Sequence, residues 1–277
     1  MNPARILIIA GSDSGGGAGI QADIKTVTAL GGYAMTAVTA LTAQNTCGVQ
    51  GVQGIEPAFI REQIRSVVED IGIDCIKTGM LHDRAVIDAV ADELEISAWG
   101  VPRVIDPVMV AQSGDRLVAD DSMAYLRDRL IPGARLMTPN IPEAQALLGE
   151  PIESTGAMEA AAEALLAFGS EAVLLKGGHL ADPVLVDVLA TSAGTVRLEH
   201  PRIDTRSDHG TGCTLASAIA EGLGRELTLA HAVHRGRDYL HAALASAPVL
   251  GRGHGPVNHS HTVRPYGLAP DGDAETG

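Results

Sequence analysis

The sequence predicts an α/β protein with a central, mostly parallel β-sheet that is flanked by helices on both faces. Short apolar runs alternate with amphipathic stretches of helical periodicity along most of the 277 residues, which is typical of β-α-β units. Hydrophobic residues make up 45% of the chain but aromatic residues only 3%, so the core must be built from Ala, Val, Leu and Ile, which suit buried parallel strands. Polar residues follow several of the apolar runs, and open parallel sheets bind ligands at the edge where their strands end.

The apolar runs give the positions of the expected strands, and the periodic stretches give those of the helices. Strands are expected at residues 6–10, 36–46, 73–80, 103–109, 134–140 and 172–179, with two more short strands within 183–198 around a turn at 192–194. Helices are expected at residues 18–30, 57–71, 83–94, 143–148, 158–168, 214–224 and 229–244.

We expect a single domain that covers residues 1–266. A chain of this length can bury one large core, and it contains no repeat, linker or low-complexity block that would separate two domains. Residues 267–277 are small and acidic, and we expect them to form a disordered tail.

Charge and cysteine content restrict the partners and the compartment. The formal net charge of −14 and the pI near 5.0 argue against a broad nucleic-acid surface, which needs clustered Lys and Arg. Cys47, Cys75 and Cys213 are far apart in the sequence, which favours a reducing cytosol over a disulfide framework or a zinc site. The apolar run at 6–10 is much shorter than the roughly 18 residues of a membrane span. We therefore expect a soluble, cytoplasmic protein without a membrane segment.

A glycine-rich loop, GSDSGGGAG at residues 11–19, follows the first expected strand and precedes a helix. Many phosphate-binding loops begin in this way, but this loop lacks the Lys-Ser/Thr pair of a Walker loop and fits the dinucleotide fingerprint only loosely. The alternative is a tight turn in which glycine lets the backbone pass without a ligand.

The motif GTGC at residues 210–213 comes just before an Ala-rich helix that is expected to begin near Thr214. Backbone N–H groups of Gly210, Thr211 and Gly212 and the positive end of the helix dipole would converge on an anion there. Cys213 would lie in the same field, which favours the thiolate and suits a base or a nucleophile. The alternative is that Cys213 is a small core residue and that the glycines cap the helix.

The segment TPNIPE and the residue Asp106 supply oxygen ligands at the ends of two expected strands. Glu143 and Asp106 would suit Mg²⁺, which prefers carboxylate and water oxygens. The alternative is that Asn140 caps a helix and Glu143 closes a capping box with it, and the two roles are compatible. We expect Pro139 and Pro142 to prevent a regular first helical turn here.

Two further strand ends carry polar side chains. Lys176 follows four apolar residues and precedes two glycines, which suits a contact to phosphate, although a surface lysine whose stem packs on apolar residues would give the same pattern. Gln44 has an amide that donates and accepts in one plane, as an aminopyrimidine edge requires, or it caps a loop. His254, His259 and His261 have no nearby carboxylate or cysteine to complete a metal site, so we favour a structural or subunit-contact role for them.

The order of the motifs resembles that of a known enzyme family. These motifs are AGSDSGGGAGIQAD, ALTAQNTCGVQ, KTGML, DPVM, TPNIPEA, LLKGGH, HGTGCTLASA and GPVNHSH. Together they resemble the hydroxymethylpyrimidine/phosphomethylpyrimidine kinases of thiamin biosynthesis, which have the ribokinase-like fold. The resemblance extends from about Ile6 to His261, and one departure from the family is Gly15, where a serine is usual.

The resemblance implies two ATP-dependent phosphorylations with Mg²⁺ as cofactor. The first converts 4-amino-5-hydroxymethyl-2-methylpyrimidine to its monophosphate, and the second converts the monophosphate to the diphosphate. The implied roles are a base for the first step at Cys213, an anion hole at Gly210, Thr211 and Gly212, pyrimidine contacts at Gln44, Gly11, Asp23, Met80 and Val108, phosphate contacts at Lys176, Asn140 and Asp106, and magnesium ligands at Glu143 and Asp106.

Two other functions remain open at this point. A pyridoxal or pyridoxine kinase of the same fold would also phosphorylate a planar ring that carries a hydroxymethyl group, and a binding protein would have kept the pocket without catalysis. The resemblance further suggests a homodimer.

Overall fold

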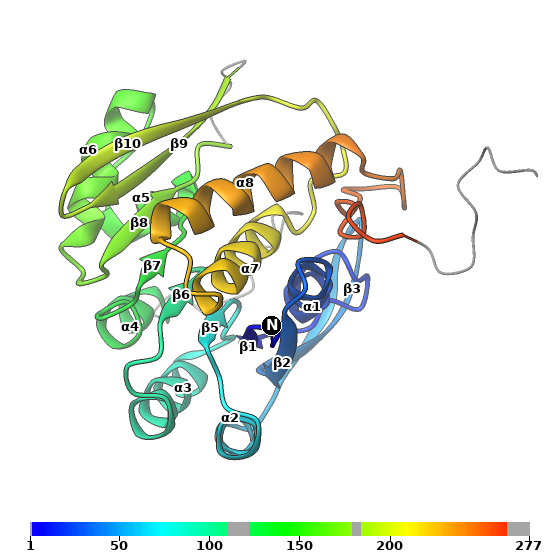
Figure 1. The fold of residues 1–277 in the computed structure, drawn as a ribbon, viewed down its shortest axis with the longest axis vertical. Coiled ribbons are helices and arrows are strands. Elements are labelled where there is room, and N and C mark those ends of the chain that lie inside the picture. Colours follow the sequence, from blue (N-terminus) through cyan, green and yellow to red (C-terminus); the bar gives the residue numbers. More distant parts are fainter. Residues whose placement is uncertain (1, 110–121, 179–183, 265–277) are drawn as a thin grey trace, which may run out of the picture.

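The computed structural model describes residues 2–109, 122–178 and 184–264. An eight-stranded sheet lies between two layers of helices, as the sequence predicts (Figure 1). The strands are β1 (Arg5–Ala10), β2 (Tyr33–Val38), β3 (Ala40–Asn45), β4 (Gly48–Gly54), β5 (Cys75–Thr78), β6 (Arg103–Ile105), β7 (Leu136–Met137), β8 (Ala172–Leu175), β9 (Val184–Thr191) and β10 (Gly194–Pro201). The helices are α1 (Gly19–Ala29), α2 (Pro57–Asp70), α3 (Arg84–Ser97), α4 (Ser122–Arg129), α5 (Ile141–Leu148), α6 (Thr155–Leu166), α7 (Thr211–Gly224) and α8 (Leu229–Ala245).

The strand order of the main sheet is β10-β9-β8-β7-β6-β5-β1-β2. All neighbours from β2 to β8 pair in parallel, and only β9 runs antiparallel to β8 and β10. Strand β1 lies between β2 and β5. From β1 the chain adds β2 on one side and β5 to β10 on the other side, so the strand order reverses between β1 and β5. Ligands of open α/β sheets bind outside the carboxyl ends of the strands at such a reversal, so the topology predicts the position of the site.

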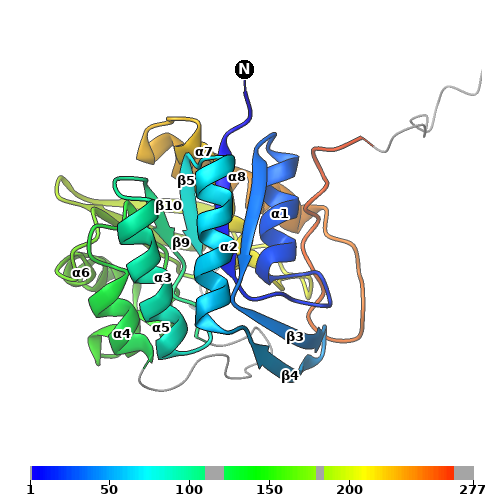
Figure 2. The ribbon, with the colours of Figure 1, turned by 90° about the horizontal axis from the view of Figure 1, so that it is seen from below.

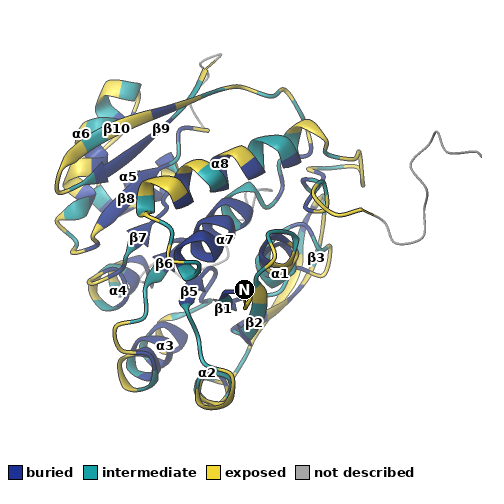
Figure 3. Ribbon diagram, in the orientation of Figure 1, coloured by how far each residue is buried: buried dark blue, intermediate teal, exposed yellow. Residues whose placement is uncertain are grey.

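Side chains on adjacent positions of the central strands enter two separate cores. In β1, Leu7 and Ile9 pack with the apolar residues of α2 to α6, whereas Ile6 and Ile8 pack with those of α1, α7 and α8. Figure 2 shows the layer of α2 to α6 from outside. Figure 3 shows that the helices bury the faces they turn to the sheet. The period-2 alternation of a strand thus explains why a continuous apolar run can support helices on both faces.

Two parts of the fold differ from the expectation. The strand expected at 36–46 is interrupted at Thr39: β2 stays in the main sheet, while β3 leaves it and pairs antiparallel with β4 in a separate two-stranded sheet. Helix α4 was also not expected. In β4 the sequence GVQGVQG places glycine and glutamine around two valines, and in α4 the apolar residues are few, so neither segment carries a strong periodic signal.

Helix α5 begins at Ile141 and includes Pro142 in its first turn, so the expectation that Pro139 and Pro142 would prevent a regular first turn is wrong. Proline lacks an N–H group, but the N–H groups of a first turn have no intrahelical acceptor, and proline is therefore tolerated there.

The hairpin of β9 and β10 is confirmed, and an ion pair attaches α8 to it. Arg237 Nε lies 2.8 Å from Asp187 Oδ2, and the same guanidinium donates to the carbonyl oxygen of Leu198 at 2.6 Å. The second carboxylate oxygen of Asp187 accepts from the N–H of Gly177 at 2.9 Å. The side chains are only 4% and 7% exposed, so each charge depends on its partner.

We expect Arg237→Met to lower the free energy of unfolding by about 3–5 kcal/mol, because it leaves the Asp187 carboxylate buried without its countercharge. Urea denaturation measures this change. The matched control is Arg197→Met, which removes the more exposed pair with Glu159 and should cost much less, because solvent screens that pair. Equal losses of unfolding free energy in the two variants would show that the buried pair stabilises the fold no more than the exposed pair does.

Candidate active site

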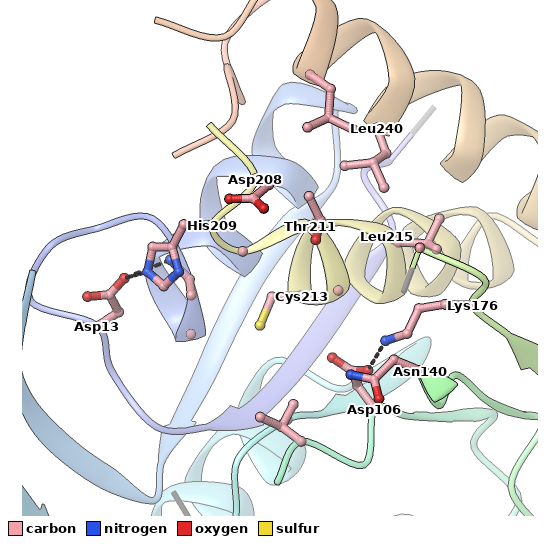
Figure 4. Close-up of a pocket in the computed structure, with 18 of the residues that line it drawn as sticks. Asp13, Asp106, Asn140, Lys176, Asp208, His209, Thr211, Cys213, Leu215 and Leu240 are labelled. Carbon is pink, nitrogen blue, oxygen red and sulfur yellow. Dashed lines mark hydrogen bonds and ion pairs between the residues drawn. The ribbon is translucent and has the colours of Figure 1, made fainter. Parts of the chain in front are cut away.

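A cavity of about 550 Å³ lies at the carboxyl edge of the main sheet (Figure 4). Its walls come from the ends of β1, β5, β6, β7 and β8, from the start of α7, and from β10 and α8. The predicted site residues that line it are Gly11, Gln44, Met80, Asp106, Val108, Asn140, Glu143, Lys176, Gly210, Thr211, Gly212 and Cys213. The structure therefore brings together twelve side chains or glycines that the sequence places at separate strand and helix ends.

The glycine-rich loop between β1 and α1 folds around the carboxylate of Asp13. This carboxylate accepts from the N–H groups of Gly15, Gly17 and Ala18 at 2.8–2.9 Å, and it lies 2.9 Å from His209 Nε2. Burial opposes ionisation of Asp13, but the hydrogen bonds from His209 and from the loop outweigh it and hold the pKa of this carboxyl below its usual range. The loop is thus closed by its own aspartate and tied to the segment before α7.

The GTGC turn, where we expect an anion hole, contains a left-handed glycine. Gly210 has φ of +81°, and α7 begins directly after it at Thr211 rather than near Thr214. A Cβ atom on Gly210 would lie 1.9 Å from the carbonyl oxygen of Gly17, so only glycine lets the two loops approach this closely. The N–H groups in the first turn of a helix have no intrahelical acceptor, and in α7 that of Thr211 donates to the carbonyl oxygen of Asp208 at 3.4 Å. The first turn of α7 lines the cavity, as an anion site requires.

His259 supports the same turn from behind. Its Nε2 atom lies 3.0 Å from Thr214 Oγ1, and Thr214 Oγ1 also donates to the carbonyl oxygen of Gly210 at 2.8 Å. Burial lowers the pKa of His259 to about 4, so the ring is neutral at physiological pH. This contact supports the structural role that we favoured for the histidine motif.

Cys213 lies in the first turn of α7 and lines the cavity. The expectation that the helix end makes its thiolate prevalent is wrong for the free protein, because burial raises the pKa of the thiol to about 12. A nearby lysine, Lys77, and the N–H of Gly19 act in the opposite direction but do not overcome burial. The thiol is therefore protonated near neutral pH before substrates bind.

Asp106 and Lys176 form an ion pair at the cavity wall. Lys176 Nζ donates to Asp106 Oδ1 at 3.0 Å, and Thr138 Oγ1 donates to the same oxygen at 3.0 Å. Lys176 is 15% exposed and Asp106 1%, and Figure 4 shows the ammonium and the carboxylate facing one another below the start of α7. The pair places one positive group and one carboxylate next to the first turn of α7, where a Cβ atom on Gly212 would lie 3.2 Å from Lys176 Nζ and 3.7 Å from Asp106 Oδ2.

Asn140 and Glu143 form the capping box that the sequence offered as one alternative. Asn140 Oδ1 accepts from the N–H of Glu143 at 2.9 Å, and Glu143 Oε2 accepts from the N–H of Asn140 at 2.7 Å. Burial raises the pKa of Glu143 to about 7, opposed by the charge of Lys176 and reinforced by that of Asp106. Because burial destabilises the ionised form of Glu143, a cation bound nearby would stabilise that form.

The two carboxylates fit a divalent metal only together with other ligands. No group of three or more His, Cys, Asp or Glu side chains in the described ranges has the arrangement of a metal site. Asp106 and Glu143 nevertheless offer hard oxygen atoms on one wall, and Mg²⁺ is typically held by one or two carboxylates, water and substrate phosphates. The donor set therefore fits a magnesium ion that arrives with a nucleotide.

Asp23 was expected near the pyrimidine pocket, but it is not among the residues that line the cavity. Its side chain is fully buried beneath the site, where it accepts from Lys77 Nζ at 2.9 and 3.0 Å and from Ser217 Oγ at 2.7 Å. The motif position gave the correct neighbourhood, but it did not reveal the lysine that holds the carboxylate away from the cavity.

The sequence did not reveal the part of the cavity between β10 and α8. Leu240 and Leu244 of α8 lie on one side of it, and the rings of His200 and His241 stack at a centroid distance of 4.9 Å. No motif marks these residues, because they come from the middle of a helix and the end of a strand.

Of the helices that the structure describes, none is both long and apolar enough to cross a lipid bilayer.

Comparison with known proteins gives one family. The family model described as phosphomethylpyrimidine kinase matches residues 13–258. A hydroxymethylpyrimidine/phosphomethylpyrimidine kinase of Rhizobium meliloti is 47% identical over 258 residues, which cover 92% of this chain and 96% of that protein. The thiamine biosynthesis bifunctional protein ThiED of Geobacter sulfurreducens is 50% identical over 92% of this chain, and the chain spans about half of its length, 52%.

A solved structure gives the same fold. The ADP complex of Bacillus subtilis pyridoxal kinase superposes with a TM-score of 0.86 and 34% sequence identity, and the match covers 94% of this chain and 98% of that one. The sheet order, the position of the cavity and these matches agree with the ribokinase-like fold that the motifs predict. The chain is a kinase and belongs to the phosphomethylpyrimidine kinase family.

Proposed function

We propose that this protein phosphorylates 4-amino-5-hydroxymethyl-2-methylpyrimidine with ATP and then phosphorylates the resulting monophosphate to the diphosphate. The observation that carries the proposal is that the start of α7, the Lys176–Asp106 pair, Gln44 and Met80 all line the same cavity. A phosphoryl donor and a planar acceptor can meet there at one anion hole. Phosphoryl transfer needs chiefly such alignment and charge neutralisation.

In the first step, the thiol of Cys213 loses its proton to solvent as the substrates bind, and the thiolate then accepts the proton of the hydroxymethyl group as the hydroxymethyl oxygen attacks the γ-phosphorus. The bond from the γ-phosphorus to the bridging oxygen breaks, and ADP leaves with that electron pair. The N–H groups at the start of α7 bind the moving phosphoryl oxygens, and Lys176 neutralises charge on the nucleotide. In the second step the acceptor is a phosphate oxygen that is already ionised near neutral pH, so no base is required.

The pyrimidine is placed by the loop of β1 and by β3. Gln44 lies on β3 beside the glycine-rich loop. Its backbone N–H donates a hydrogen bond to Ser14 Oγ of that loop at 2.8 Å. Its side-chain amide suits the donor and acceptor edge of an aminopyrimidine. The N–H of Gly11 donates to the carbonyl oxygen of Met80 at 3.1 Å, so the loop after β1 and the segment after β5 are joined where both line the cavity.

The nucleotide is placed in the remaining part of the cavity, with its phosphates toward Lys176 and Asn140 and its base between β10 and α8. Leu215, Leu240 and Leu244 give this part an apolar wall of the kind that a base contacts. Mg²⁺ bound to Asp106 and Glu143 would neutralise charge on the phosphates.

We expect Glu143→Gln to raise the Mg²⁺ concentration for half-maximal activity by about tenfold or more, because one anionic ligand is lost. The amide oxygen can still accept from the Asn140 N–H, so the capping box is kept. Because the pKa of Glu143 is about 7, protons compete with Mg²⁺ below that pH in the wild type, and the Mg²⁺ requirement should rise from pH 8 to pH 6. The variant should lack this rise.

A Mg²⁺ titration of the kinase rate at both pH values measures these effects. Glu153→Gln, at an exposed position, is the matched control and should behave as the wild type. A titration of Glu143→Gln that coincides with the wild type at both pH values would count against a metal contact.

The proposed function is tested by a product-resolved assay with the pyrimidine alcohol and its monophosphate in separate reactions. We expect ADP together with the monophosphate from the first and the diphosphate from the second. ADP formation without either product would contradict the proposal, and binding of the pyrimidine without ATP consumption at high enzyme concentration would favour a binding protein.

A second candidate is pyridoxal kinase, which the structural match to the Bacillus subtilis enzyme favours. A much higher kcat/KM for pyridoxal than for the pyrimidine alcohol in the same assay would select it. As parts of the proposal, we also place the protein in the cytoplasm and infer a homodimer, which analytical ultracentrifugation would test.

A further inference from the structure

A fully buried charge pair lies beneath the cavity, outside the set of residues that line it. Lys77 of β5 and Asp23 of α1 are both 0% exposed, and the ammonium contacts both carboxylate oxygens at 2.9 and 3.0 Å. Ser217 of α7 donates to the same carboxylate at 2.7 Å. Burying two charges seldom stabilises a fold relative to apolar residues, so this pair calls for another explanation.

The pair is next to the thiol of Cys213. Ser217 follows Cys213 by one helical turn, so both side chains lie on the same face of α7. A Cβ atom on Gly79, a residue of the cavity wall, would lie 3.0 Å from Lys77 Nζ, which places the ammonium immediately behind that wall. The N–H of Gly19, the first residue of α1, points to the sulfur of Cys213.

We propose that Lys77 is the countercharge of the Cys213 thiolate in the phosphorylation of the alcohol, and that Asp23 limits this effect by sharing the ammonium. Lys77 is then a positioning residue, since it acts through Cys213 and touches no reacting atom. The part of the inference that concerns catalysis rests on the proposed function, but the part that concerns the thiol does not.

The charges around the sulfur agree with this assignment. Four charged groups face Cys213 from the surrounding elements: Lys77, Asp23, Asp106 and Lys176. Burial raises the pKa of the thiol, Lys77 lowers it, and Asp23 and Asp106 raise it again. The starts of α1 and α7 add two positive dipole ends. Of the two cations in this set, Lys176 lines the cavity and is 15% exposed, whereas Lys77 is 0% exposed and does not line it.

Two substitutions that break the same ion pair should act on the thiol in opposite directions. In Lys77→Met, Asp23 loses its countercharge and takes up a proton, because burial already raises its pKa, so the thiolate has no cation behind it. In Asp23→Asn, the charges of Cys213 and Asp106 still support the Lys77 ammonium, which is no longer shared with Asp23, so the thiolate is favoured. If the ion pair had only a structural role, the two substitutions would change the reactivity of the thiol in the same direction or not at all.

The test is the rate of alkylation of Cys213 by iodoacetamide at pH 8, in a Cys47→Ser background and read by mass spectrometry of the Cys213 peptide. Only the thiolate reacts, so a shift of one pKa unit changes the rate about tenfold. We expect Asp23→Asn to react about tenfold faster than the parent and Lys77→Met about tenfold slower. Rates that move in the same direction, or that do not move, would overturn the proposal.

Folding and catalysis are followed in the same samples. If Lys77→Met fails to fold by circular dichroism, Asp23→Asn alone decides, because an unchanged or slower alkylation rate contradicts the proposal. In the folded variants, kcat/KM for the alcohol should follow the alkylation rate while kcat/KM for the monophosphate stays within about threefold. Opposite alkylation shifts in a protein without kinase activity would keep the charge assignment and reject the proposed function.

Discussion

Cys213→Ala is expected to lower kcat/KM for the pyrimidine alcohol by about 10²–10⁴-fold, the range that loss of a general base produces. For the monophosphate the loss should stay below about tenfold, because its acceptor oxygen is ionised near neutral pH and has no proton to lose. The difference between the losses of kcat/KM for the two substrates measures how much the thiol contributes as a base. Burial raises its pKa to about 12 in the free protein, so the first step must also lower that pKa when the substrates bind.

The two rates are measured with the same enzyme preparation by separating the monophosphate from the diphosphate. Cys47→Ala is the matched control, since Cys47 is exposed on the β3–β4 hairpin and is not among the residues that line the cavity. It should leave both rates at the wild-type level. Equal losses for the two substrates in Cys213→Ala would contradict the role of a base and would favour a packing role in the anion hole.

Local sequence patterns were sufficient for the layered fold and for bringing most of the expected site residues to one cavity. The run RILIIA shows only that a strand is buried, but its alternating side chains must enter two cores, and this requires helices on both faces. Polar residues such as Asp106 and Lys176 interrupt the apolar runs where the strands end, and parallel strands bring such ends to one edge. The prediction therefore rested on properties of short segments.

The parts that sequence could not give depend on contacts between distant segments. Asp23 and Lys77 are 54 residues apart and Asp13 and His209 are 196 apart, and no local pattern identifies either partner. The protonation of Cys213 was predicted wrongly for the same reason, since the helix end was visible in the sequence whereas the enclosure of the thiol was not. Helix ends and strand ends are local features, but burial and ion pairing are not.

Gly210→Ala is expected to lower kcat/KM for both substrates by at least about 10²-fold, the cost of disturbing an anion hole. A methyl group here would lie 1.9 Å from the carbonyl oxygen of Gly17, and the residue would have to keep φ of +81°, which costs about 1–2 kcal/mol for an L-residue. The loop of Asp13 and the first turn of α7 must then separate. Because both phosphorylations use this turn, the loss should not depend on the protonation of the acceptor.

The matched control is Gly156→Ala in the first turn of α6, where a Cβ atom would meet only Ser154 Oγ at 4.0 Å. This variant should keep both rates and gain up to about 1 kcal/mol in the free energy of unfolding, because alanine restricts the unfolded chain. Assays of both substrates and urea denaturation separate the effects. Gly210→Ala with wild-type rates would show that the contact between the two loops is not needed for the anion hole. A loss confined to the alcohol would instead assign the turn to Cys213 alone, because a shared anion hole must serve both acceptors equally.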